Sequence, residues 1–136
     1  MIDGTPRLSC LCLAGQVEGS SIITVEGLAD GAHLAPIQSC FAEHGGSQCG
    51  FCTPGFLVTA QALLNENSAP TNDEVALAIE GNLCRCTGYQ QIIDSIEAAA
   101  AIHRGESETL APASEPHPDP HPSGPGEPTM PPGHAK

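Results

Sequence analysis

The 136-residue sequence is poor in basic residues, in aromatic residues and in long apolar runs. Four Lys and Arg residues stand against sixteen Asp and Glu residues, and the formal net charge is −12, which argues against binding to nucleic acid or to an anionic membrane surface. No stretch approaches the roughly 18 consecutive apolar residues of a membrane span. With no Trp, one Tyr and three Phe, a core must be built from Leu, Ile, Val and Ala, so we expect it to be small.

Seven cysteines are many for a chain of this length. In a secreted protein such a count would indicate a disulfide framework. Residues 1–7 (MIDGTPR) lack the apolar core of a signal peptide, so we expect a cytoplasmic location, where thiols ligate metals more readily than they form disulfides. Export as part of a larger complex stays open as an alternative.

The last quarter of the chain differs in composition from the rest. Residues 105–136 contain nine of the 13 prolines and three of the six histidines, with almost no large apolar side chain. Such a segment cannot bury enough apolar surface to offset the entropy lost on ordering, so it predicts a disordered tail. His117 and His121 could bind a metal loosely, but a solvated Pro-rich tail is the simpler interpretation.

The first residues have the pattern of the end of a β-sheet. Asp3-Gly4 is a hairpin-turn signal, and residues 21–25 (SIITV) form a β-branched run that is typical of a short strand. A hairpin needs two arms, yet only two residues precede this turn. We therefore expect residues 1–27 to be the end of a domain whose earlier strands precede Met1.

Residues 28–104 are predicted to form four helices of about 10–14 residues each. Every helix has an apolar stripe at helical spacing, and these stripes must pack together to be stable. The start signals are Pro36 in a first turn, Thr53 as an N-cap ahead of Pro54, a capping box from Thr71 to Glu74, and Gly88 ahead of the last helix. The expected fold class is mainly α.

Four of the cysteines lie in two close pairs. Cys49 and Cys52 form a C-x-x-C motif and, after 31 intervening residues, Cys84 and Cys86 form a C-x-C motif. Each pair precedes a predicted helix, whose N-terminus presents unpaired N–H groups and partial positive charge. A [2Fe-2S] cluster on four thiolates is an anion that two such helix ends would suit, so the pattern favours one cluster on these four residues.

Two other interpretations of the four cysteines stay open on spacing alone. A structural zinc ion also prefers thiolates, although zinc ribbons usually pair two C-x-x-C-like knuckles on hairpins. A thioredoxin-like redox pair would need a βαβ context that this sequence lacks. Arg85 is either a surface residue or a cation that moderates the charge of the cluster. Cys40 and Cys12 are expected to be buried structural thiols.

The segments 47–55 (SQCGFCTPG) and 80–89 (EGNLCRCTGY) are highly specific. They resemble the small iron-sulfur subunit of the molybdenum hydroxylases, the family of xanthine dehydrogenase, aldehyde oxidoreductase and carbon monoxide dehydrogenase. The resemblance extends over about residues 1–103 and favours iron-sulfur over zinc. It implies a four-helix [2Fe-2S]-binding domain over residues 28–104, preceded by a remnant of a plant-type ferredoxin β-grasp domain over residues 1–27 and followed by the tail.

The resemblance also implies roles for three further positions. In this family the ferredoxin domain holds a second cluster, and Cys10 matches its fourth ligand. Because the other three ligands would precede Met1, we expect the chain to be N-terminally truncated and the second site to be empty. Gln48 and Cys86 match residues that lie close to the pterin of the molybdenum cofactor.

The function implied by the resemblance is electron transfer. A large molybdenum-binding subunit would perform the substrate chemistry, and this chain would carry single electrons towards FAD on a flavin subunit or towards another acceptor. We therefore expect a subunit of an oxidoreductase with no catalytic residue of its own. A structural four-cysteine zinc module and a non-functional truncated fragment are the two alternatives.

Overall fold

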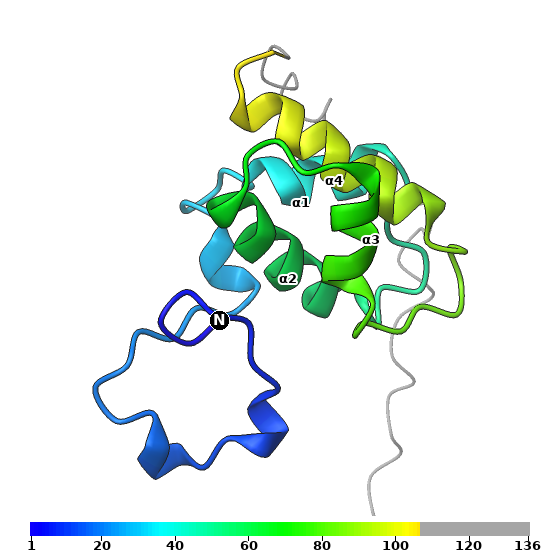
Figure 1. The fold of residues 1–136 in the computed structure, drawn as a ribbon. Helices are drawn as coiled ribbons and strands as arrows, with labels where there is room; N and C mark the ends of the chain where they lie inside the picture. Colours follow the sequence, from blue (N-terminus) through cyan, green and yellow to red (C-terminus); the bar gives the residue numbers. More distant parts are fainter. Residues whose placement is uncertain (107–136) are drawn as a thin grey trace, which may run out of the picture.

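The structure is a computed structural model that describes residues 1–106. Within them, α1 packs mainly on α4, and α3 packs on both α2 and α4. The mainly α fold with four helices is confirmed, although two of the helices have 8 residues rather than the expected 10–14. The helices are α1 (Pro36–Glu43), α2 (Thr53–Glu66), α3 (Asn72–Ile79) and α4 (Gln90–His103) (Figure 1).

The core is aliphatic, with two phenylalanines, and it lies between the four helices. Most of its buried residues come from the predicted apolar stripes, so the helices are amphipathic largely where the sequence pattern places them. Cys40 is 0 % exposed, which confirms it as a buried thiol, whereas Cys12 is only half-buried and that prediction was wrong. The core residues are Ile37, Cys40, Phe41, Phe56, Leu57, Ala60, Leu64, Val75, Ile79, Ile92, Ile96, Ala99 and Ala100.

The helix starts determine where the two cysteine loops lie. α3 begins with the predicted capping box, in which Glu74 N donates to Thr71 Oγ1 (3.3 Å) and Thr71 N donates to the Glu74 carboxylate (2.7 Å). The N-cap of α2 is Cys52 rather than the expected Thr53. α4 is preceded by Tyr89, which has a left-handed backbone with φ 71°. The chain therefore enters two of the helices directly from cysteine-bearing loops.

Gly46 brings the loop that follows α1 very close to α4. A Cβ at this position would lie 2.7 Å from Ser95 Oγ and 2.9 Å from Phe41 Cδ1, both shorter than ordinary contacts. Glycine is therefore required here because of close packing, and it holds the beginning of the Cys49 loop against the core.

The N-terminal segment extends away from the bundle as an open loop (Figure 1). Asp3 and Gly4 both have positive φ (48° and 80°), as in the type I′ turn that this dipeptide predicts. Ile2 pairs with Ile22 in an isolated antiparallel bridge. The strand expected over residues 21–25 does not form. Its partner is the short segment before Asp3, which offers one bridge, and the residues that follow turn towards the core.

The described residues contain no β-sheet, so the expected β-grasp remnant is not confirmed. Three short 3₁₀ turns occupy part of the segment instead, and the last of them packs Leu28 against the core. The predicted tail lies almost wholly outside the described residues, as do His117 and His121. No helix within residues 1–106 has both the length and the apolar character needed to cross a membrane.

Candidate metal centre

The two cysteine pairs meet on one side of the helical bundle. Cys49 lies close enough to Cys86 for the two thiols to shift each other's pKa, and Cys84 likewise raises the pKa of Cys52. Their loops, the one leading into α2 and the one between α3 and α4, lie together on the right of Figure 1. Residues more than thirty positions apart in the sequence are thus brought together by the packing of α2, α3 and α4.

In space the four thiols pair differently, Cys49 with Cys86 and Cys52 with Cys84. In each of these spatial pairs the surroundings make one thiol more acidic than the other. The backbone N–H of Phe51 and the Cys86 thiol lower the pKa of Cys49. Burial and the neighbouring Cys84 raise the pKa of Cys52, while the interaction with Cys49 raises that of Cys86. Cys49 is therefore the more acidic thiol of its pair with Cys86.

Cys84 is the acidic member of the other pair, and Thr87 is the main reason. Thr87 Oγ1 lies 3.2 Å from Cys84 Sγ, and Thr87 N donates to the same sulfur at 3.4 Å. These contacts, with a further one from the backbone of Cys86, lower the pKa of Cys84 to about 7. The local backbone thus favours negative charge on this sulfur, as a metal ligand requires.

The donor chemistry fits a two-iron cluster better than a single ion. Within residues 1–106, no three Cys, His, Asp or Glu side chains converge closely enough to hold one metal ion. The four thiols lie as two neighbouring pairs instead, and a [2Fe-2S] cluster takes two protein ligands on each iron. A structural zinc site would bring all four donors around one point.

The two loops that hold the thiols carry exposed apolar side chains and few charges. Phe51 is 94 % exposed and Leu83 is 84 % exposed, and each lies beside a cysteine. No charged residue occurs between Glu43 and Glu66, and Arg85 is the one charge in the Cys84–Cys86 loop. Large exposed apolar side chains beside a candidate site are typical of a surface that another protein covers.

The two other predicted site residues, Gln48 and Cys10, lie in different parts of the structure. Gln48 is exposed and directly precedes Cys49 in the same loop, beside the clustered thiols. Cys10 is exposed on the N-terminal segment and takes no part in the contacts among the four thiols.

Sequence reasoning missed Thr87 and Tyr89 as site residues. The Tyr89 hydroxyl accepts a hydrogen bond from Cys84 N (3.0 Å) and donates one to Asn82 O (3.3 Å). A hydroxyl residue three positions after a candidate ligand, as Thr87 is after Cys84, was the available signal, because such residues often bond to nearby groups in turns.

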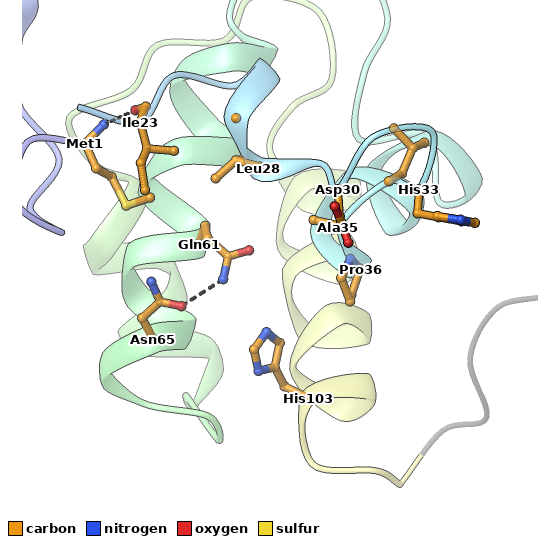
Figure 2. Close-up of a pocket in the computed structure, with 12 residues that line it drawn as sticks. Met1, Ile23, Leu28, Asp30, His33, Ala35, Pro36, Gln61, Asn65 and His103 are labelled. Carbon is orange, nitrogen blue, oxygen red and sulfur yellow. Dashed lines mark hydrogen bonds between the residues drawn. The ribbon is translucent and has the colours of Figure 1, made fainter. Parts of the chain in front are cut away.

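Two hollows lie outside the thiol cluster. One, with a volume of about 450 Å³, is lined mostly by residues 23–36, with Gln61 and Asn65 of α2 and His103 at the end of α4 on its other side. Figure 2 shows these three side chains, with Gln61 and Asn65 joined by a hydrogen bond. The other, of about 800 Å³, separates the N-terminal segment from α2 and includes Cys12 in its lining. Neither is lined by any of the four clustered cysteines.

Comparison with known proteins agrees with this geometry. The model of a family described as "[2Fe-2S] binding domain" matches residues 24–97. The nicotine 6-hydroxylase small subunit of Paenarthrobacter nicotinovorans is 54 % identical over 96 residues, which are 71 % of this chain and 58 % of that protein. The xanthine dehydrogenase iron-sulfur-binding subunit of Escherichia coli O157:H7 is 44 % identical, over 71 % of this chain and 62 % of that subunit.

A solved structure with the same fold is that of quinoline 2-oxidoreductase from Pseudomonas putida 86. It is 54 % identical, with a TM-score of 0.73, over 77 % of this chain and 66 % of that chain. The chain spans about three fifths of the length of the curated relatives that it matches.

Proposed function

The chain belongs to the [2Fe-2S] binding domain family, and we propose that it is the electron-transfer subunit of a molybdenum-dependent oxidoreductase. In this proposal it carries single electrons from a molybdenum cofactor on one partner subunit towards FAD on another, or towards a different acceptor. It holds one cluster on four thiolates, those of Cys49, Cys52, Cys84 and Cys86.

The observation that carries the proposal is the meeting of the two thiol pairs from separate loops. A bound [2Fe-2S] cluster supplies a one-electron redox centre. The protein groups next to the sulfurs are donors, namely Phe51 N–H at Cys49 and the Thr87 N–H and hydroxyl at Cys84. Donors directed at sulfur stabilise added negative charge, so this chain favours the reduced form more than bare thiolates would.

The surface around the thiols supports a protein partner on the same side. Because Phe51 and Leu83 are exposed and the two cysteine loops carry few charges, covering these loops would remove apolar area from water at little electrostatic cost. We propose that the partner is the large molybdenum-binding subunit. Gln48 and Cys86, both exposed here, are then the residues that approach the pterin.

Cys10 is proposed, on the family resemblance, as one ligand of a second cluster. The thiol is exposed and free, so nothing within residues 1–106 competes with that role. The cytoplasm is the proposed location, because a reducing compartment keeps ligand thiols available.

Metal analysis of the purified full chain tests the cluster. We expect about two iron and two acid-labile sulfide per chain, with visible absorption that is lost in Cys84→Ser and retained in the control Cys12→Ser. About one zinc and no sulfide would establish the structural zinc module instead. Failure of the chain to co-purify with a molybdenum-containing subunit would argue against the proposed partner and for a non-functional fragment.

A further inference from the structure

Tyr89 has a backbone conformation that a bulky residue rarely adopts. Its φ of 71° lies in the left-handed region, where Asp3 is the one other non-glycine residue among residues 1–106. Tyr89 is also the N-cap residue of α4, yet its side chain makes no capping hydrogen bond. Strain of this kind persists where surrounding contacts over-determine the conformation, and Tyr89 makes such contacts through its ring, its hydroxyl and its backbone N–H.

The aromatic ring of Tyr89 is fixed from the side of the core. It stands edge-on to Phe56, with ring centroids 6.1 Å apart and an angle of 74° between the planes. Phe56 is 0 % exposed and belongs to the first turns of α2. A side chain held by a buried ring can present its hydroxyl at one defined place.

The hydroxyl of Tyr89 connects the two backbone groups on either side of Leu83. It accepts from Cys84 N at 3.0 Å and donates to Asn82 O at 3.3 Å. One hydroxyl thereby satisfies a donor and an acceptor of the loop that no helix or strand satisfies.

A second connection runs from the backbone of Tyr89 to the sulfur of Cys84. Tyr89 N donates to Thr87 Oγ1 at 3.2 Å, and the same oxygen lies 3.2 Å from Cys84 Sγ. Once the sulfur is a thiolate it can only accept, so the Thr87 hydroxyl donates to it while accepting from Tyr89. Tyr89 therefore holds both the backbone and the side chain of Cys84.

The same network ties the Cys84 loop to α2, which begins directly after Cys52. Asn82 Nδ2 donates to Thr59 Oγ1 at 3.4 Å. Gly55 leaves room for this amide, since a Cβ there would lie 3.3 Å from Asn82 Nδ2. Asn82 and the Tyr89 ring thus join the loop to α2 from two directions.

From these contacts we infer that Tyr89 is a positioning residue for the metal centre, and that its hydroxyl fixes Cys84 opposite Cys52 before iron binds. The inference rests on the proposed function, because it concerns how the chain holds a cluster. The strained backbone of Tyr89 follows from this positioning role. The left-handed turn directs its ring to Phe56 and its N–H to Thr87.

The test is Tyr89→Phe in the full chain, reconstituted with iron and sulfide. Phenylalanine keeps the ring against Phe56 and removes only the hydroxyl. We expect the cluster to assemble, its reduced-state EPR signal to broaden, and iron to pass to a chelator about tenfold faster, the lower end of what loss of an outer-shell partner costs.

The matched control is Thr71→Ala, which removes the N-cap of α3 and destabilises the helices without touching either cysteine loop. It should lower the thermal midpoint and leave the EPR signal and the iron-release rate unchanged. If Tyr89→Phe releases iron no faster than Thr71→Ala and keeps the wild-type EPR signal, the inference is overturned.

Two further results separate the inference from the proposed function. A wild-type chain that assembles no cluster refutes the proposed function, and the inference with it. If Tyr89→Phe fails to fold, amide hydrogen exchange in the metal-free wild-type chain decides instead, because the Cys84 N–H that donates to the Tyr89 hydroxyl should be protected. Exchange of this amide at the rate of an open loop overturns the inference.

Discussion

Replacing Thr87 with valine would remove one hydrogen bond to a candidate ligand sulfur while nearly preserving side-chain shape. In the native chain the hydroxyl lies 3.2 Å from Cys84 Sγ, and Thr87 N remains as a second donor at 3.4 Å. We predict that Thr87→Val makes the reduction potential of the cluster more negative, because the lost donor stabilised the more highly charged reduced form.

The magnitude follows from the charge of the two redox states. A hydrogen bond to a charged group contributes about 1.5–3 kcal/mol. A four-thiolate cluster carries about −2 oxidised and about −3 reduced. If the strength of the hydrogen bond scales with the charge of the cluster, about a third of its energy in the reduced state is missing from the oxidised state. This difference is about 0.5–1 kcal/mol. At about 59 mV per 1.4 kcal/mol for one electron, the expected shift is roughly 20–40 mV.

The assay is a redox titration of the reconstituted chain, followed by the EPR signal of the reduced state. Thr87→Ser is the control, since serine keeps the hydroxyl and should stay within about 10 mV of the native potential. A potential for Thr87→Val that is unchanged, or that moves to a more positive value, would show that the hydroxyl does not donate to the ligand sulfur.

Three other predictions concern the helical scaffold. Gly46→Ala should cost about 1–3 kcal/mol of stability through overpacking, and Ser95→Ala, which removes the nearest contact, should recover part of that loss in thermal unfolding of the double variant. Cys40, whose burial raises its pKa to about 11, should resist iodoacetamide in the native chain and react only in denaturant; labelling at the rate of the exposed thiols would contradict this. Thr71→Ala should lower stability by about 1 kcal/mol. The hydrogen bond from Thr71 N lowers the pKa of Glu74, so the capping contribution should be present above the unfolded pKa and lost as pH falls through the folded one. The test is to measure the free energy of unfolding as a function of pH. The loss of stability at low pH should be seen in the native chain and should be absent from Glu74→Gln.

The helices were predictable because their signals are local. The capping box at Thr71 and the first-turn proline at Pro36 act within a few residues of their own position, and the structure has helices at both. The strand over residues 21–25 was not, because a strand exists only where a partner pairs with it. Here the partner amounts to one bridge between Ile2 and Ile22.

The candidate ligands were also predictable, because cysteine spacing and the motifs around it are visible in one dimension. The hydrogen bonds that position these cysteines could not be predicted from the sequence. The Tyr89 hydroxyl reaches Cys84 N only because the backbone at Tyr89 turns left-handed, and threonine at position 87 shows its use only once its oxygen is placed beside sulfur. The burial of Cys12 was wrongly predicted for the same reason. Burial depends on which helices pack over a residue, and little of the helical bundle covers the N-terminal segment.

The exposure of the clustered thiols bears on the order of events in biogenesis. Cys49 and Cys86 are exposed while Cys52 and Cys84 are half-buried, so on the proposed function iron and sulfide can reach the thiols of an already folded chain. If the proposed partner subunit covers Phe51 and Leu83, it also closes that route. On that proposal, folding, cluster assembly and docking follow in that order, and docking is the step that protects the cluster from exchange.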